Sequence, residues 1–207
     1  MKDVNILVVV ISCKKNQHLW PRILERNVPN LIIICGGSDE TILREKILYL
    51  NCNDTYDGLP EKIMMACDYI LNSNDFDFTH ILKADDHDTE FTSGQICNIQ
   101  QKFKNILKSQ NYIGQYMVHP RTMGRRHHFN KVPKDSKWHN KLFNGPAISY
   151  LGGGQTYILS KYSMNLILSK KEEVQDHILE DYMVGSILLK YDIRPYKVNY
   201  GIRTWKV

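Results

Sequence analysis

The sequence predicts an α/β protein with a mostly parallel central sheet and helices on both faces. Continuous β-branched runs at residues 5–12 and 30–35 are typical of strands that are buried on both faces of such a sheet. Segments with helical spacing of apolar residues alternate with these runs, without an internal repeat or a linker. At 207 residues the chain is long enough for one core and too short for two ordinary domains, so we expect a single domain over 1–207.

The first half of the chain contains four predicted strands and two predicted helices. Pro21 delays the start of the first helix by about one turn, and Pro60 suits the first turn of the second helix. The last of these strands runs directly into a group of acidic residues. The predicted strands lie at 5–12, 30–35, 45–50 and 78–84, and the predicted helices at 16–27 and 59–71.

The second half continues the alternation. Thr92 and Gln95 have the spacing of a capping box, which predicts a helix that begins there and carries an apolar stripe to Leu107. Further helices are predicted from residue 161 and over 178–191, and further strands at 112–118, at 156–159 and at the end of the chain.

Composition excludes several classes of protein. With 43% hydrophobic and 24% charged residues, the chain is typical of a globular protein and not of a disordered or fibrous one. No apolar run approaches the roughly 20 residues of a membrane span, and the N-terminus lacks the features of a secretory signal. Five widely spaced cysteines favour free thiols in a reducing compartment. These features predict a cytoplasmic location.

The positive charge is concentrated in one segment. Residues 119–141 contain seven Lys and Arg residues and one Asp, a net charge of +6, which leaves −1 for the rest of a chain whose total is +5. This basic segment can hold a diphosphate or an anionic acceptor, or contact nucleic acid, and an ordinary solvated loop is the simplest alternative.

The acidic residues after the predicted strand at 78–84 are the first candidate site. Asp85, Asp86 and Asp88 lie within four residues and repel one another unless a cation neutralises them. Oxygen ligands suit Mg²⁺ and Mn²⁺, and Asp86 with Asp88 can present two carboxylates to a metal that carries substrate phosphates. His87 is a candidate third ligand, and Asp85 can contact a ribose or a backbone amide. The alternative is a solvated acidic turn.

Two further motifs can carry chemistry. Glu180 and Asp181 begin a predicted helix, where they either complement the helix dipole or provide an ionised general base. The glycines at 152–154 either form a turn or allow a ligand to approach the backbone closely. They match neither a P-loop nor the dinucleotide-binding fingerprint, so we exclude both.

Four blocks in order resemble the β-1,3-galactosyltransferase, N-acetylglucosaminyltransferase and Fringe group of inverting glycosyltransferases. Trp20-Pro21-Arg22 is a weaker echo of the group's N-terminal basic block, and Lys137-Trp138 resembles its K-W before the glycines. The blocks at 54–62, 83–88, 153–160 and 180–185 resemble D-S-Y-x-N-L-T-x-K, K-x-D-D-D, G-G-x-G-[YF]-x-[IL]-S and E-D-V-x-x-G.

The resemblance implies a GT-A fold, a nucleotide-sugar donor, most often a UDP-sugar, and Mn²⁺ or Mg²⁺ as cofactor. It implies that Asp181, or alternatively Glu180, deprotonates a hydroxyl of a glycan, protein or small-molecule acceptor, and that the metal is held by Asp86, Asp88 and His87. The implied donor-binding residues are Ser12, Arg22, Tyr56, Lys62, Lys83 and Asp85, and the implied acceptor or sugar-binding residues are Gly153, Gly154, Tyr157 and Trp138.

The sequence departs from the group in three ways. His87 stands where the third Asp of the triplet is usual, no His follows Asp181, and the chain lacks the membrane anchor and disulfides of the Golgi enzymes. The last departure suggests a viral or microbial setting. A retaining transferase on the same fold, a non-catalytic sugar-nucleotide binder and a polyanion-binding protein remain alternatives, although we expect no nucleic-acid partner.

Overall fold

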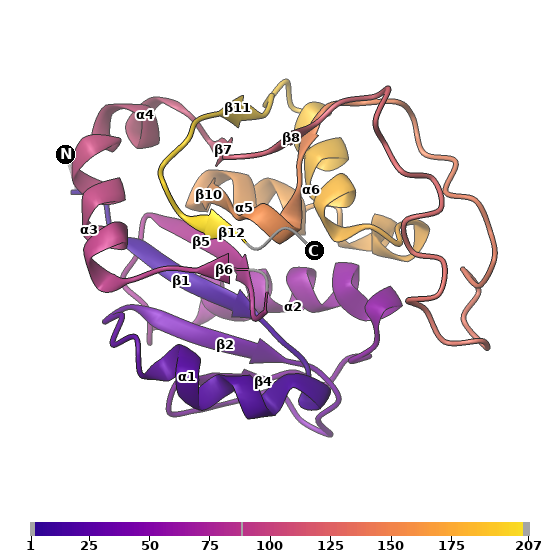
Figure 1. The fold of residues 1–207 in the computed structure, drawn as a ribbon, viewed down its shortest axis with the longest axis horizontal. Helices are drawn as coiled ribbons and strands as arrows, with labels where there is room; N and C mark the ends of the chain where they lie inside the picture. The colour runs from indigo at the N-terminus through magenta and orange to yellow at the C-terminus, as the bar shows by residue number, and fades with distance from the viewer. Residues whose placement is uncertain (1–2, 88, 205–207) are drawn as a thin grey trace.

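The computed structural model describes residues 3–87 and 89–204. Within them, eight strands form one sheet in the order β11-β7-β10-β5-β1-β2-β4-β3 (Figure 1). The strands are β1 (Ile6–Ile11), β2 (Leu31–Cys35), β3 (Ile42–Arg44), β4 (Ile47–Tyr49), β5 (His80–Asp85), β6 (Thr89–Glu90), β7 (Tyr112–Gly114), β8 (Met117–Val118), β9 (Tyr150–Leu151), β10 (Tyr157–Ser160), β11 (Tyr196–Lys197) and β12 (Arg203–Thr204).

Helices cover both faces of this sheet. They are α1 (Trp20–Leu24), α2 (Leu59–Asn72), α3 (Ser93–Lys102), α4 (Lys104–Ser109), α5 (Lys161–Leu168) and α6 (Glu180–Leu189), with 3₁₀ turns η1 (Lys14–Leu19), η2 (Tyr56–Gly58), η3 (Gly153–Gln155) and η4 (Lys171–Asp176). The apolar residues of α2, α5 and α6 pack on one face, and those of α1, α3 and α4 on the other. The predicted α/β class is therefore confirmed.

The sheet is mostly parallel, with two exceptions. Strands β1, β2, β4 and β5 run parallel, whereas β10 is antiparallel to both β5 and β7 and β3 is antiparallel to β4. Because parallel strands end at one edge, the residues that follow β1 and β5 lie side by side there. Ile11 is in register with Asp85, so Ser12 lies next to Asp86.

Most sequence predictions of single elements are confirmed. The capping box at Thr92 and Gln95 is formed, and Pro21 lies in the first turn of α1, whose start is preceded by a 3₁₀ turn. The helix predicted from Thr92 to Leu107 is instead two helices, because Phe103 has φ −104° and ψ 14° and interrupts the helical backbone. The five cysteines are free thiols, as predicted.

Residues 119–149 form turns and irregular chain, and they extend from the body of the molecule at the right of Figure 1. His128 is buried within this loop, and Val132 and Phe143 anchor the loop to the body. Phe143 packs with its ring 4.7 Å from that of Tyr182 on α6. No helix among the described residues is long and apolar enough to cross a membrane.

Candidate active site

The carboxylate of Asp86 is fixed at the carboxyl edge of the sheet. Ser12, which follows β1, donates its hydroxyl to Asp86 Oδ2 (2.6 Å), and the Trp20 indole N–H donates to Ser12 Oγ (2.7 Å). The side chain of Asp86 is only 4% exposed, so a chain of buried hydrogen bonds sets its orientation. Trp20 belongs to the block that resembles the family's N-terminal motif. Through Ser12 it helps to set the orientation of the Asp86 carboxylate.

A small cavity of about 90 Å³ lies beside this carboxylate. It is lined by Arg22 on α1, by Arg26 just after α1, and by Asp86, His87 and Glu90. Arg22 forms an ion pair with Glu90 (2.7 Å), and His87 Nδ1 lies 2.7 Å from Asp86 Oδ1. Two guanidinium groups line this cavity beside the carboxylates of Asp86 and Glu90, and guanidinium groups suit a phosphate-bearing ligand, with or without a metal ion.

The predicted metal ligands stay a prediction. Asp88 lies outside the described residues, and in the described part of the chain no three His, Cys, Asp or Glu side chains converge on one point. Mg²⁺ and Mn²⁺ commonly use one or two protein carboxylates and complete their shell with water and substrate phosphates. Asp86 fits such a partial ligand set, and the described residues alone do not form a complete one.

A second group of charged residues surrounds Lys83, whose side chain is only 2% exposed. Its ammonium lies 2.5 Å from Asp85 Oδ1 and 2.9 Å from Glu180 Oε1, and it donates to the Gly153 carbonyl (3.2 Å). Burial lowers the pKa of Lys83, but the two carboxylates raise it by more, so its pKa lies above the ordinary value. Lys83 therefore stays charged and joins β5, η3 and α6.

Glu180 is buried in this group. Tyr157, itself fully buried, donates its hydroxyl to Glu180 Oε2 (2.9 Å). Burial raises the pKa of Glu180 to about 7; Lys83 opposes this rise, whereas Asp181 and Asp85 add to it. One ammonium thus pairs with two carboxylates, and Glu180 is protonated more readily than an ordinary glutamate.

Asp181 lies in the first turn of α6 and is half-buried. The Gly153 backbone N–H donates to Asp181 Oδ2 (3.1 Å), and the Tyr182 backbone N–H donates to Oδ1 (2.8 Å). Burial raises the pKa of Asp181, while the Gly153 hydrogen bond and the charge of Lys83 lower it. The carboxylate is thus oriented by the backbone, and among the described residues each of its oxygens accepts one hydrogen bond.

The glycine segment forms the turn η3 between β9 and β10. A Cβ atom on Gly153 would lie 2.1 Å from Glu180 Oε1 and 2.9 Å from Lys83 Nζ, so a side chain does not fit there. Thr156, where the family motif has a glycine, has φ +64°, a conformation that costs free energy for a β-branched residue. Its hydroxyl lies 2.6 Å from that of Tyr200 and ties the C-terminal segment to this turn.

Lys62 holds neighbouring strand ends together. This buried side chain donates to the Ser12 carbonyl (2.8 Å) and to Asp54 Oδ1 (2.7 Å). Asp54 also accepts from the backbone N–H groups of Gly36 and Lys14. The sequence analysis did not assign Asp54 to the site. Its signal was present, because Asp54 is the first residue of the block at 54–62 that resembles the family.

Aromatic residues form the wall next to Asp181. Burial raises the pKa of Tyr56, and the charge of Asp181 raises it further, which indicates that the two side chains lie close together. The ammonium of Lys131 lies 5.2 Å from the centre of the Tyr56 ring. Trp138 belongs to the same cluster but lines a separate cavity of about 210 Å³.

The structure thus brings most of the predicted residues into one region. Asp85 and Asp86 are consecutive, and the contacts of Lys83 and Gly153 continue from Asp85 to Asp181. Lys83, Tyr157 and Gly153 are buried and reach Asp181 or Glu180. Gly154 is half-buried in η3. The predicted contacts of all these residues with substrates stay predictions.

Comparisons with known proteins give one family match. A family model described as galactosyltransferase matches residues 38–199. No curated protein matches the chain.

Two solved structures illustrate the structural relationship. A cytidylyltransferase from Leptospira borgpetersenii covers 94% of this chain and 76% of its own, with a TM-score of 0.50 and 7% identity. A 4-diphosphocytidyl-2C-methyl-D-erythritol synthase from Anaerococcus prevotii covers 94% and 88%, with a TM-score of 0.46 and 12% identity. The first of these shows the GT-A-like α/β fold. Because the family match spans most of the chain, this protein belongs to the galactosyltransferase family of glycosyltransferases.

Proposed function

We propose that this glycosyltransferase is metal-dependent and inverting, and that it moves a sugar from a UDP-sugar to an acceptor hydroxyl. The observation that carries the proposal is the set of contacts that runs from Asp85, the chain neighbour of Asp86, through Lys83 and Gly153 to the Asp181 carboxylate. A donor site and a base are thereby held at a fixed separation, as an in-line displacement requires.

The donor diphosphate is assigned to the cavity beside Asp86. Arg22 and Arg26 supply positive charge there, and Asp86, with Asp88 and His87 as further candidates, would hold Mn²⁺ or Mg²⁺. When bound, the ion supplies a Lewis acid that stabilises the negative charge on the diphosphate leaving group. Ser12 and Lys62 act by holding the strand ends, and Tyr56, Lys83 and Asp85 complete the donor side.

Asp181 is assigned as the general base. It is the more exposed of the two acids at the start of α6, and both of its oxygens can still accept a proton. Glu180 is instead held between Lys83 and Tyr157. The proton of the acceptor hydroxyl passes to Asp181 while the acceptor oxygen attacks the anomeric carbon. The bond to the diphosphate oxygen breaks on the opposite face, so the configuration inverts.

The test is sugar transfer from UDP-sugars with Mn²⁺, with the product's anomeric configuration read by NMR. Loss of the base in Asp181→Asn lowers kcat by about 10²–10⁴. Asp86→Asn raises the donor KM and the Mn²⁺ concentration needed. The exposed Asp192→Asn is the matched control, since this side chain is 88% exposed and lies at the far end of α6.

Three results contradict the proposal. Full activity of the Asp181→Asn and Asp86→Asn variants would remove both assigned roles. A product with retained configuration would instead establish the retaining alternative, and donor binding without turnover would establish a non-catalytic sugar-nucleotide binder. The cytoplasmic location stays a prediction.

A further inference from the structure

The loop at residues 119–149 carries positive charge that the proposed reaction does not use. It contains seven Lys and Arg residues and a single acidic residue, Asp135, whereas the net charge of the whole chain is only +5. Every one of the seven basic residues is exposed to solvent. They are Arg121, Arg125, Arg126, Lys131, Lys134, Lys137 and Lys141.

Most of this charge is not neutralised within the protein. In the part of the chain that the structure describes, five of the seven side chains have no carboxylate within ion-pair distance: Arg121, Arg125, Arg126, Lys134 and Lys141. By contrast, Arg22 pairs with Glu90 on the body of the molecule. Like charges that face solvent together repel one another, so this loop suits an anionic partner outside the chain.

Two hydrogen bonds tie the two arms of the loop together. The Phe143 backbone N–H donates to the Arg125 carbonyl (3.0 Å), and the Nε2–H of His128 donates to the Lys141 carbonyl (2.7 Å). His128 and Phe143 are both buried, which fixes the backbone at these points. Residues 125–126 and 141–142 therefore lie side by side. We call Arg125, Arg126, Lys141 and Leu142 the basic patch.

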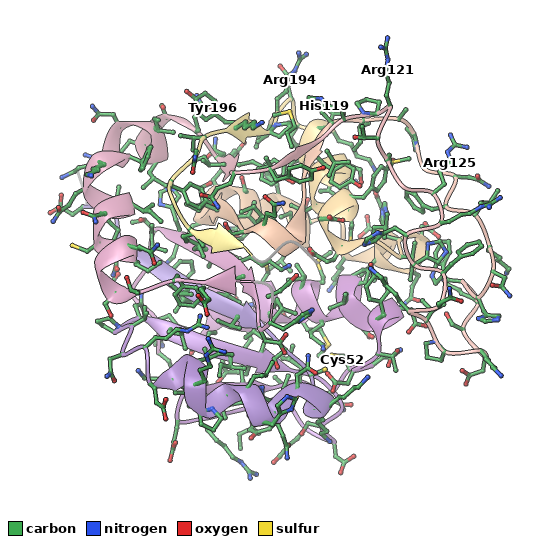
Figure 2. The ribbon with its side chains drawn as sticks, viewed as in Figure 1. Cys52, His119, Arg121, Arg125, Arg194 and Tyr196 are labelled. Carbon is green, nitrogen blue, oxygen red and sulfur yellow. The ribbon has the colours of Figure 1, made fainter. Side chains whose placement is uncertain are left out.

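The basic patch also contains an exposed apolar side chain. Leu142 is 44% exposed, although its neighbour Phe143 is buried. Figure 2 shows the side chains of Arg121 and Arg125 pointing outward, away from the body of the molecule. Basic groups beside an exposed aliphatic group suit a membrane of anionic lipids, because the charges attract the headgroups and the apolar group enters the interface.

The aromatic rings of this region favour lipid over nucleic acid as the partner. Surfaces that bind single-stranded nucleic acid usually offer exposed aromatic rings on which bases stack. Here the rings pack within the protein: that of Phe129 lies 5.2 Å from that of His128, and that of Phe143 lies 4.7 Å from that of Tyr182. The large exposed side chain of the basic patch is instead aliphatic.

We propose that the basic patch docks the protein on a membrane surface of anionic lipids. Arg125, Arg126 and Lys141 contact the headgroup phosphates, and Leu142 enters the interface. The loop packs on the first turn of α6 through Phe143 and Tyr182, so the membrane lies at the end of the molecule where α6 begins. This docking does not depend on the transfer reaction.

Cosedimentation of the full chain with lipid vesicles tests the charges of the basic patch. The wild type should bind vesicles of phosphatidylcholine and phosphatidylglycerol in equal parts, bind less as the salt concentration rises, and not bind phosphatidylcholine alone. The double variant Arg125→Ala/Arg126→Ala should lose about thirtyfold in affinity, which is about fivefold for each charge removed.

A second double variant is the matched control. Lys102→Ala/Lys108→Ala removes the same net charge from exposed positions on α3 and α4, at the opposite side of the molecule from the loop in Figure 1. It should bind the mixed vesicles as the wild type does. Equal losses in the two double variants, or no binding of the wild type to the mixed vesicles, overturns the proposal.

Leu142→Ala separates a membrane from a soluble polyanion. This variant keeps every charge, so it should lose about fivefold in affinity for the mixed vesicles and bind single-stranded RNA as the wild type does. Wild-type binding to RNA that is tighter than its binding to vesicles, with Leu142→Ala unchanged in both assays, would assign the basic patch to nucleic acid and overturn the proposal. Neither assay requires sugar transfer, so a failure of the proposed function leaves both results readable.

Discussion

Gly153 has a steric requirement that follows from its neighbours rather than from its own backbone. Ala at this position would place Cβ 2.1 Å from Glu180 Oε1 and 2.9 Å from Lys83 Nζ. Gly153→Ala is therefore expected to lower the free energy of unfolding by about 1–3 kcal/mol and to reduce transfer, because it separates Lys83 from Glu180. Urea titration and initial rates measure the two effects.

Gly94→Ala is the matched control for that substitution. The Cβ of an Ala at this position in α3 would have only Thr92 Oγ1 nearby, at 3.9 Å. The Gly94→Ala variant should be more stable than the wild type by at most about 1 kcal/mol, because Ala is the better helix former. Equal losses in the two variants would show that the Lys83–Glu180 pair does not constrain Gly153.

Glu180 makes stability depend on pH. Its pKa is raised from 4.5 to about 7 in the folded protein, so the folded state binds the proton more tightly than the unfolded state. The stabilisation is complete below the unfolded pKa and is lost as the pH rises through the folded pKa. Relative to Glu180→Gln, the wild type should lose up to about 3 kcal/mol between pH 4.5 and 7. Parallel denaturation curves across this range would contradict the assignment.

Lys83 is expected to control the protonation of the base. Its charge lowers the pKa of Asp181, so Lys83→Met should raise that pKa further above its ordinary value. The acidic limb of the transfer rate then moves to higher pH, since the base must be ionised to accept the proton. Rates from pH 5 to 9 measure the shift.

Lys62→Met provides the comparison for Lys83. Lys62 is an equally buried lysine, but it bonds to Asp54 and to the Ser12 carbonyl instead of the Asp181 region. The Lys62→Met variant should lose about as much stability as Lys83→Met, and the acidic limb of its pH–rate profile should not move. A similar shift in both variants would mean that general loosening, rather than the charge of Lys83, moves the profile.

The limits of sequence reasoning are clear from these residues. Acids after a buried strand could be recognised because Asp85 and Asp86 are neighbours in the chain. The pairing of Lys83 with Glu180 could not be recognised from the sequence, because it depends on β5, η3 and α6 meeting in space. The resemblance placed both residues in the site, but only the packing shows that Glu180 is enclosed.

At the scale of the elements, local signals predicted the strands and capped helices well. The continuous apolar runs of β1 and β2 and the Thr92 capping box needed no tertiary information. Tertiary information was needed for the antiparallel direction of β10 and for the break at Phe103. Neither feature has a local sequence signal as strong as a cap or a proline.

The C-terminal strand β12 supports the acid loop, because it pairs with β6, which directly follows that loop. Gln115 fixes this segment by donating to the Ile202 carbonyl (2.8 Å) and accepting from the Ile202 N–H (3.1 Å). Gln115→Ala should speed amide exchange at residues 202–204 and raise the donor KM. Gln101→Ala, whose amide contacts Cys97 on the same helix, is the control. Unchanged exchange would show that Gln115 does not hold the segment.

At the scale of the whole molecule, one sheet connects two apolar layers. Alternate residues of β1 enter opposite layers: Leu7 and Val9 pack with α2 and α6, and Val8 and Val10 with α1 and α3. Strand β5 divides in the same way, with Ile81 on one face and Leu82 on the other. Neither layer can therefore lose its packing without exposing the strands that support the other.

Leu82→Ala tests this coupling. Leu82 is fully buried and lies in register with Val8 and Ile158, so its truncation should cost about 2–5 kcal/mol. Because the sheet is shared, tryptophan fluorescence and far-UV circular dichroism should report one transition with one midpoint in both the variant and the wild type. Leu142→Ala, at a side chain in the loop that is 44% exposed, should change stability by at most about 0.5 kcal/mol. Two separated midpoints would instead show that the layers unfold independently and that the chain does not behave as a single domain.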